Sequence, residues 1–283
     1  MTAPARVASL HLYPLKGGRG IEVESARVTP RGIEGDRRYM VVDENGVFVS
    51  QREASRLALV TALPVPGGLR LEACGSWMEV PRVEDEAALR VARLWAGTCV
   101  GVDQGDGVAA WLSRWLDRPC RLLWQPETAP RRVDQRYAVS AGDVVSFADG
   151  YPLLVCSSAS LAVLNSQLEA PVPMNRFRPS LVVEGWTEPW FEDRVARLRA
   201  GEVELALVKQ CARCVVTTVD QRTAERGREP LRTLARIRRS QRGAMFGENA
   251  IPTLVGAVAA GDRVEVVEAL DREREPVWSV AQS

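Results

Sequence analysis

The sequence is almost without histidine, because His11 is the only one among its 283 residues. A serine hydrolase or a cysteine–histidine pair would need that side chain beside its nucleophile. His11 instead lies in a strand-like run, far from any Gly-x-Ser-x-Gly motif. Histidine is also the side chain best suited to moving protons near neutral pH. Its scarcity favours an enzyme that relies on cysteine, on carboxylates or on a bound cofactor.

Other absences exclude further classes of protein. Lys and Arg total 37 against 36 Asp and Glu, which gives a net charge of +1. Broad binding to nucleic acid or to a membrane surface is therefore not expected, because both need a basic excess. No apolar run approaches the roughly 18 residues of a transmembrane helix. The first residues lack the ordered regions of a signal peptide. No P-loop motif occurs, and the glycine-rich segment 17–20 has no βαβ unit around it to make a dinucleotide site.

The six cysteines are irregularly spaced, which is typical of reduced thiols rather than of a disulfide framework. We expect a cytoplasmic protein.

Short strands dominate the prediction for the first part of the chain. Residues 21–28 alternate apolar and polar side chains, and Asn45-Gly46 predicts a tight turn between strands 38–42 and 47–51. Strands near 57–63, 69–73 and 77–80 follow, separated by Pro and Gly turns. This spacing is typical of a β-barrel or a β-sandwich. The chain is long enough for one large or two ordinary domains.

Three helices interrupt the strands. The apolar side chains of residues 107–117 recur with helical spacing and include a tryptophan pair that we expect in the core. A serine at 157 or 158 caps a second helix that runs to about residue 169, and residues 230–239 form a third. A polar, proline-marked segment at 125–134 predicts a domain boundary or a surface loop. The predicted fold class is therefore mainly β with some helices (α+β). We divide the chain into two predicted domains, residues 1–123 and residues 124–283.

The segment with most chemical content is Cys211-Ala-Arg-Cys214, which we expect between strands 203–208 and 215–219. A structural zinc site would need two more Cys or His ligands, and no second close pair exists. A thioredoxin-like dithiol belongs at a strand-to-helix turn, whereas Val-Val-Thr-Thr-Val after Cys214 predicts a strand. Two alternatives stay open: one thiolate offered to a soft metal with Arg213 beside it for an anion, or an inert buried pair. Arg176 and Arg178, on either side of Phe177, are likewise an anion clamp or a solvated edge.

Several segments, taken in chain order, resemble the MOSC superfamily. The resemblance is greatest to bacterial proteins similar to the mitochondrial amidoxime-reducing component. Residues 13–16 (Tyr-Pro-Leu-Lys) and 35–42 (Gly-Asp-Arg-Arg-Tyr-Met-Val-Val) resemble the MOSC N-terminal β-barrel. The segments that resemble the MOSC domain are 149–154, 157–161, 176–179, 211–220, 246–249 and 261–262. The resemblance assigns the N-terminal β-barrel to residues 1–123 and the MOSC β-barrel domain to residues 124–283.

The resemblance implies that a molybdenum cofactor (molybdopterin) lies between the two β domains. Cys214 matches the family's protein ligand to molybdenum, and Asp149 matches an acidic position near the metal, a candidate proton donor or substrate contact. Cys211 is expected to pack rather than to bind metal. The chain departs from the family at Gly17 and Ser180, where the family often has Ser and Asn. The positions expected to contact the pterin or its phosphate are Lys16, Arg37, Ser160, Arg178 and Arg213.

The activity implied by the resemblance is reduction of small N-hydroxylated compounds at molybdenum. The sequence has no Cys-x₄-Cys-x₂-Cys motif of a plant-type ferredoxin domain. Electrons are therefore expected from a separate ferredoxin, flavoprotein or cytochrome. The alternative is a protein that carries the cofactor or its sulfur without turnover. Pyridoxal phosphate is not expected.

Overall fold

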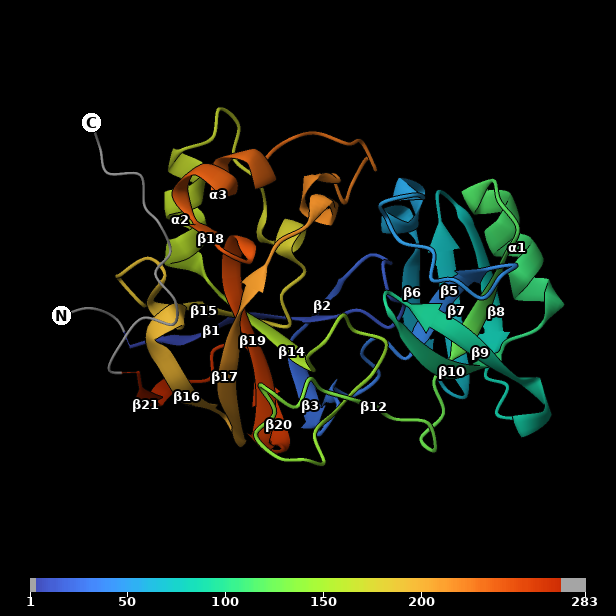
Figure 1. The fold of residues 1–283 in the computed structure, drawn as a ribbon, viewed down its shortest axis with the longest axis horizontal. Coiled ribbons are helices and arrows are strands. Elements are labelled where there is room, and N and C mark those ends of the chain that lie inside the picture. Colours follow the sequence, from blue (N-terminus) through green and yellow to red (C-terminus); the bar gives the residue numbers. More distant parts are fainter. Residues whose placement is uncertain (1–3, 271–283) are drawn as a thin grey trace.

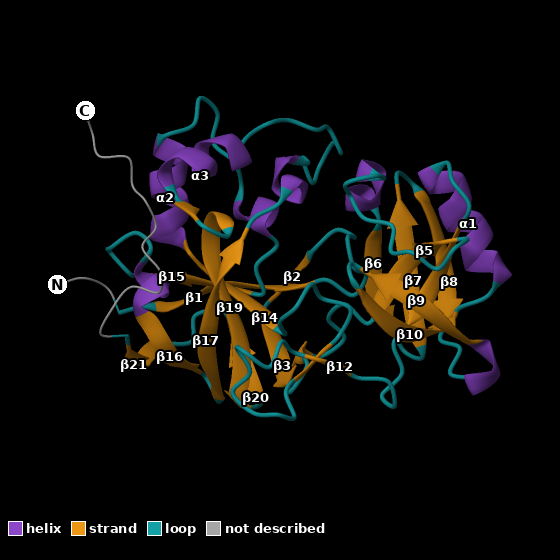
Figure 2. Ribbon diagram, viewed as in Figure 1, coloured by secondary structure: helices purple, strands orange, loops and turns teal. Residues whose placement is uncertain are grey.

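Short runs of β-branched and apolar residues, separated by Gly, Pro and Asn turns, form strands in most of the molecule. The computed structural model describes residues 4–270, which form two lobes side by side (Figure 1). These residues contain 21 strands and three α-helices, and Figure 2 shows how few of the elements are helical. The predicted fold class, mainly β with some helices, is confirmed.

The larger lobe is built on a nine-stranded sheet that takes its strands from both ends of the chain. Strand β1 (Arg6–Leu12) pairs antiparallel with β15 (Leu181–Glu184), so the first strand lies in the sheet of the second half. The parallel pair of β15 and β14 (Leu153–Ser157) is connected through helix α2 (Ser158–Ser166). The remaining strands are β2 (Ile21–Val23), β16 (Val195–Ala200), β17 (Val203–Ala212), β18 (Arg239–Ser240), β19 (Gly243–Leu254) and β21 (Val264–Ala269).

The smaller lobe packs two sheets and helix α1 (Asp106–Leu116) around one apolar core. Val108, Trp111, Leu112 and Leu116 are buried on the inner face of α1, as the helical spacing predicts. The second tryptophan of the expected core pair, Trp115, is only partly buried, and its Nε1 donates to the carbonyl of Arg56 at 3.2 Å. One sheet contains β5 (Tyr39–Asp43), β11 (Cys120–Trp124), β10 (Gly97–Asp103) and β9 (Leu89–Leu94); the other contains β6 (Thr61–Val65), β7 (Gly68–Ala73) and β8 (Ser76–Pro81). Two smaller sheets complete the fold. One contains β3 (Ser25–Thr29), β4 (Gly32–Ile33) and β20 (Gly256–Ala259), and the other contains β12 (Arg131–Arg132) and β13 (Val144–Val145).

Regular strand pairing within residues 4–270 leaves these sheets open, so the structure shows no closed barrel. Residues 47 and 48 make only isolated bridges, Val42 with Phe48 and Val47 with Arg93. These bridges connect β5 to β9, the two edges of the four-stranded sheet. The predicted strand 47–51 is therefore wrong, although the turn at Asn45-Gly46 is correct, because the amide of Gly46 donates to the carbonyl of Asp43 at 3.0 Å.

Three other strand predictions need correction. Residues 21–28 form two strands rather than one. The segment predicted as strand 57–63 begins with a 3₁₀ helix, η1 (Ser55–Leu59). Residues 215–219 are not a strand, because Val215–Thr218 form a 3₁₀ helix, η5. The cause is local: the hydroxyls of Thr217 and Thr218 donate to backbone carbonyls three residues earlier, at 2.9 and 2.8 Å.

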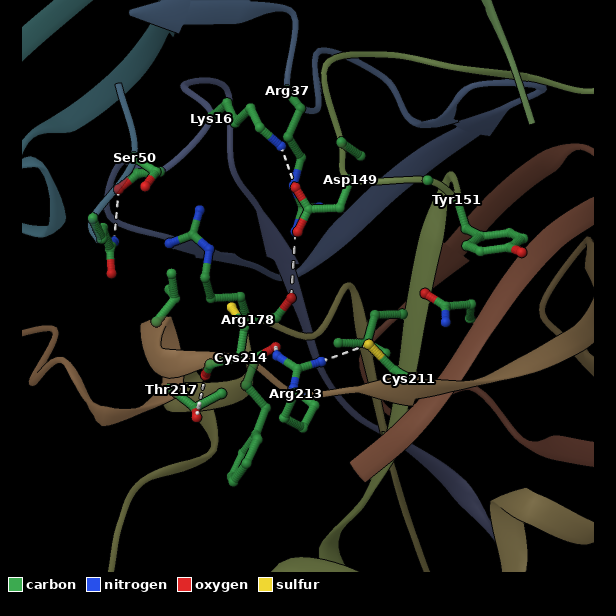
Figure 3. Close-up of a pocket in the computed structure, with 18 of the residues that line it drawn as sticks. Lys16, Arg37, Ser50, Asp149, Tyr151, Arg178, Cys211, Arg213, Cys214 and Thr217 are labelled. Atoms are coloured by element: carbon green, nitrogen blue, oxygen red, sulfur yellow. Dashed lines mark hydrogen bonds and ion pairs between the residues drawn. The ribbon is translucent and has the colours of Figure 1, made fainter. Parts of the chain in front are cut away.

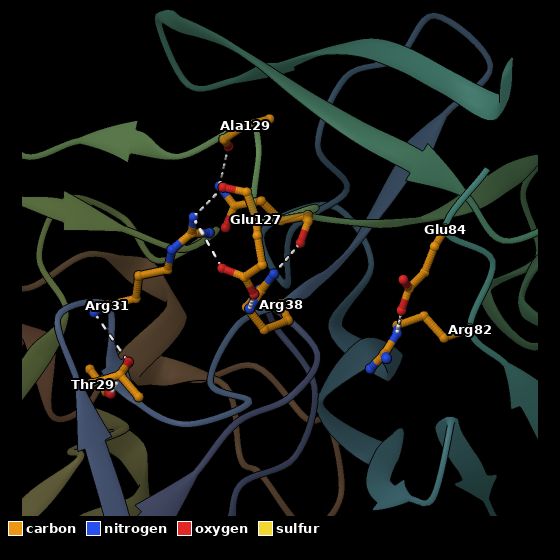
Figure 4. Close-up of polar contacts among 9 residues, drawn as sticks. Thr29, Arg31, Arg38, Arg82, Glu84, Glu127 and Ala129 are labelled. Atoms are coloured by element: carbon orange, nitrogen blue, oxygen red, sulfur yellow. Dashed lines mark hydrogen bonds and ion pairs between the residues drawn. The ribbon is translucent and has the colours of Figure 1, made fainter. Parts of the chain in front are cut away.

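The predicted boundary segment connects the lobes through charged contacts (Figure 4). Arg31 donates to the backbone carbonyl of Glu127 at 2.9 Å, and Arg38 donates to its carboxylate at 2.6 Å. Arg38 also lies over the ring of Trp124, 5.4 Å from its centroid. The division at residues 123 and 124 stays a prediction, since β1 and β3 pair with β15 and β20 of the second half.

The described residues include no helix with both the length and the apolar character needed to cross a membrane. The charged composition of segment 271–275 predicts a loose tail, and this segment lies outside the described residues.

A buried polar network lies beneath α2 in the larger lobe. Ser160 donates to Glu192 at 2.8 Å, and Gln210 donates to Asp193 at 2.9 Å. Arg238 forms an ion pair with Asp193. Burial, together with the neighbouring charge of Asp193, raises the pKa of Glu192 to about 7. Glu192 therefore holds its proton more tightly than an exposed glutamate does.

We predict that Leu112→Ala lowers the free energy of unfolding by about 2–5 kcal/mol, because it leaves a cavity at a fully buried site. Arg114→Ala on the exposed face of the same helix should change it by less than about 0.5 kcal/mol. Urea denaturation of both variants measures the difference. Equal effects would contradict the packing described for α1.

We also predict a pH-dependent difference between the wild type and Glu192→Gln. The raised pKa means that the folded state binds the proton more tightly than the unfolded state, whose Glu titrates near 4.5. The stabilisation from Glu192 is therefore present below about pH 4.5 and is lost as the pH rises to about 7. Unfolding free energies measured from pH 4.5 to 8 should fall in the wild type relative to the glutamine variant. A difference in unfolding free energy between the two proteins that stays constant across that pH range would refute the raised pKa of Glu192.

Candidate cofactor-binding site

A cavity lies where the two lobes meet, and segments far apart in the sequence line it (Figure 3). The N-terminal half contributes the loop after β1, the segment around Ser50 and the β9–β10 turn. The second half contributes the loop before β14, the segment around Arg178 and the loop after β17. Four cationic side chains line the cavity against one carboxylate, that of Asp149. An excess of positive charge in a partly enclosed space favours an anionic ligand.

Lys16 and Asp149 form an ion pair across the lobes, with 2.5 Å between Nζ and Oδ1. Lys16 is 5% exposed and its Nζ lies 4.8 Å from the centre of the Phe48 ring. Burial lowers the pKa of Lys16, and Asp149 partly opposes that shift. Desolvation at the cavity wall raises the pKa of Asp149, but Lys16 and a hydrogen bond from Trp95 outweigh it, so the net shift is downward. Asp149 is therefore a carboxylate at neutral pH, which favours the predicted role of substrate contact over that of proton donor.

The ring of Tyr13 contacts two arginines. The guanidinium carbons of Arg37 and Arg178 both lie 4.3 Å from the centre of its ring. Asp36, buried beside them, pairs with Arg37 and accepts a hydrogen bond from the amide of Tyr13 at 2.9 Å. Arg178 donates to the carbonyl of Gly18 at 2.6 Å, which connects the second half to the loop after β1. Burial lowers the pKa of Arg178 to about 10 and raises that of Tyr13 to about 12, so both keep their usual protons at pH 7.

The two cysteines have different surroundings, although both line the cavity. The sulfur of Cys211 accepts a hydrogen bond from Arg213 at 2.8 Å, and burial raises its pKa. The sulfur of Cys214 has no hydrogen-bond partner among residues 4–270. Arg213 also donates to the carbonyl of Phe177 at 2.7 Å and keeps a buried Nε without a partner among those residues. Cys214 is thus the sulfur that is available to a ligand.

Six of the seven predicted site residues line this cavity. Ser160 does not: it is fully buried, and its hydroxyl donates to Glu192 and accepts from the amide of Trp190. Its proposed cofactor contact is therefore unsupported by this arrangement, and the roles of the other six stay predictions. The six are Lys16, Arg37, Asp149, Arg178, Arg213 and Cys214.

Sequence reasoning missed the aromatic side of the cavity. Phe48, Trp95 and Tyr151 line it, and Gln51 fixes the loop after β1 by donating to the carbonyl of Gly17 at 2.7 Å. No local pattern distinguishes these residues from core or surface positions. The single available signal was Trp95 between two strand-like runs, where a large apolar side chain at a turn is unusual.

The donors present fit a soft metal with an anionic cofactor better than they fit the alternatives. No cluster of three or more His, Cys, Asp or Glu side chains occurs in the described part of the chain, so it offers no ligand set for structural zinc. The strand expected after Cys214 was one reason against thioredoxin chemistry, and that reason was wrong. The objection stands on topology, because β17 pairs antiparallel with both neighbours rather than within a βαβ unit. One free thiol in a cavity with four cationic side chains suits a cofactor that combines a thiolate-bound metal with an organic part that carries a phosphate.

Comparison with known proteins agrees with this geometry. Two family models match in chain order: the MOSC N-terminal beta barrel domain over residues 4–119 and the MOSC domain over residues 132–265. Mitochondrial amidoxime-reducing component 1 of Danio rerio is 34% identical over 250 residues, covering 84% of this chain and 76% of the relative. The Homo sapiens protein of the same name is 32% identical over 276 residues, covering 91% and 82%.

A third relative is the molybdenum cofactor sulfurase of Danio rerio, which is 29% identical over 252 residues. The match covers 82% of this chain but 30% of that longer protein. The chain therefore belongs to the MOSC family, with the MOSC N-terminal domain followed by the MOSC domain.

Proposed function

We propose that the protein binds a molybdenum cofactor in the cavity between its lobes and reduces small N-hydroxylated compounds. The observation that carries the proposal is the free sulfur of Cys214 beside four cationic side chains, in a chain similar to amidoxime-reducing components. A thiolate suits molybdenum, and the cations suit the anionic parts of a pterin cofactor.

Each cationic residue has a defined task in this proposal. Arg37 and Arg178, fixed on the Tyr13 ring, offer planar donors for a phosphate, and Lys16 offers a point charge. Arg213 lies between the two cysteines in sequence and keeps Cys211 occupied through its hydrogen bond. Cys214 is left as the single protein ligand.

Gly17, one of the departures from the family pattern, has a structural reason in this chain. Its φ of +79° is in the left-handed region, and a Cβ there would lie 2.7 Å from Leu57. Serine would therefore be strained at this position. The backbone of the loop after β1, rather than a hydroxyl, is what the chain offers to the ligand there.

When bound, the cofactor supplies two-electron oxygen-atom transfer chemistry. The overall reaction converts R–NHOH, two electrons and two protons into R–NH₂ and water. Nζ of Lys16 donates a hydrogen bond to Oδ1 of Asp149, so the pair keeps the donated proton on Lys16 at the wall of the cavity. Asp149, as a carboxylate, accepts a hydrogen bond from an N–H of the substrate and orients it.

The electrons come, in this proposal, from a separate ferredoxin, flavoprotein or cytochrome, as the sequence predicts. A cytoplasmic location also stays a prediction, since the relatives are named as mitochondrial proteins. The second candidate function is transport of the cofactor or its sulfur without turnover. The similarity to a molybdenum cofactor sulfurase supports it.

We predict that Cys214→Ala abolishes retention of molybdenum, whereas Cys211→Ala largely keeps it, because the Cys211 sulfur is occupied by Arg213. Both variants should be purified from a cofactor-producing host. Metal analysis and pterin fluorescence after oxidation give the readout. The reverse pattern would refute the ligand assignment, and wild-type protein that holds neither metal nor pterin would refute cofactor binding.

We further predict that loaded protein with an artificial electron donor reduces a hydroxylamine such as N-hydroxylaminopurine to the amine. Asp149→Asn should lower kcat/KM by about tenfold or more, because the charge-assisted hydrogen bond to substrate is lost. Chromatographic detection of the amine measures turnover. Loaded protein that gives no amine with any N-hydroxylated compound would favour the carrier.

A further inference from the structure

Trp95 occupies an unusual position at the wall of the cavity. It lies in the turn between β9 and β10 of the smaller lobe, with a φ of +57°, a conformation that bulky residues rarely adopt. Its side chain lines the cavity and is 39% exposed. Backbone strain of this kind persists where the surrounding structure holds it, and it is concentrated at functional sites.

Four contacts fix the indole ring of Trp95, and one of them is with Lys16, whose Nζ lies 5.8 Å from the ring centroid. The indole Nε1 donates to Oδ1 of Asp149 at 3.0 Å, which joins the turn to the other lobe. The Phe48 ring meets it edge to face, with 5.4 Å between centroids. The guanidinium carbon of Arg52 lies 4.3 Å from its centroid. The ring is thus held in one orientation while part of its surface stays open.

The same contacts decide which oxygen of Asp149 is available. Lys16 and Trp95 both donate to Oδ1. Oδ2 has no hydrogen-bond partner among the described residues, and 71% of the side chain is exposed. An acceptor oxygen and an aromatic surface therefore lie next to each other on one wall of the cavity.

We propose that Trp95 is a specificity-determining residue that selects substrates with a planar conjugated body and N–H donors. The planar body packs against the indole, and an N–H group donates to Oδ2 of Asp149. Aromatic contact of this kind adds a several-fold preference beyond that of an aliphatic group. The inference rests on the proposed function, since it concerns the substrate of the same site.

Binding of reaction-product analogues tests the role of Trp95 without turnover. Benzamidine and acetamidine carry the same amidinium charge, so the ratio of their Kd values in the holoprotein reports on the aromatic ring alone. Isothermal titration calorimetry should give a wild-type ratio of about five to ten in favour of benzamidine. Trp95→Gly should reduce the ratio to about one, and glycine suits the positive φ, so this variant is expected to fold.

Two further variants separate the ring from its hydrogen bond and from general effects. Trp95→Phe keeps a ring and should keep most of the ratio. Trp77→Ala is the matched control, because Trp77 is also exposed and lies under an arginine, Arg70, at 4.5 Å, but does not line the cavity. It should leave the ratio unchanged.

The outcomes distinguish this inference from the proposed function. Equal affinity of the wild type for both probes, or no binding of either, overturns the role of Trp95, as does a ratio that survives Trp95→Gly. A ratio lost in Trp95→Gly and kept in Trp77→Ala supports it. The proposed reductase fails by another measurement, the absence of amine from N-hydroxylated compounds.

Discussion

The candidate site depends on one buried arrangement, in which the ring of Tyr13 contacts both Arg37 and Arg178. Two guanidinium groups so close together repel each other, and burial makes that repulsion expensive. The electron-rich ring that both contact and the buried carboxylate of Asp36 offset this cost. The arrangement joins the loop after β1 and the segment before β15, both of the larger lobe, to Arg37, which precedes β5 of the smaller lobe. It therefore fixes the relation of the lobes and provides charged donors at the same place.

A second contact across the lobes lies close to Arg37 in the same cavity (Figure 3). Asp149 accepts hydrogen bonds from Lys16 and Trp95, both in the first half of the chain. Its carboxylate balances only one of four cations that line the cavity. Asp36 balances a second one, Arg37, and the positive charge that remains becomes favourable when an anionic ligand binds. The cationic side chains thus repel one another at the site where the cofactor is proposed to bind.

Much of the fold could be predicted where the determinants are local. The apolar spacing of α1, the caps of α2 and the turn at Asn45-Gly46 depend on neighbours a few residues away. The errors arose where distant or side-chain contacts overrode propensity. Val215 to Thr218 look like a strand by composition, yet the two threonine hydroxyls close a 3₁₀ turn. Ser160 looked like a polar site residue, yet it is the buried partner of Glu192.

The sequence by itself determined the family, the mainly β fold class and the identity of the chemical groups, because motifs and residue types survive without coordinates. The sequence favoured Cys214 over Cys211 as the metal ligand through the family resemblance alone. Only the tertiary structure decided that Arg213 occupies the Cys211 sulfur, that Ser160 lies away from the cavity, and that Trp95 meets Asp149. The physical reason is distance along the chain: Trp95 and Asp149 are 54 residues apart, and contacts at such separations follow from strand pairing and lobe packing. Neither strand pairing nor lobe packing leaves a periodic pattern in the sequence around Trp95 or Asp149.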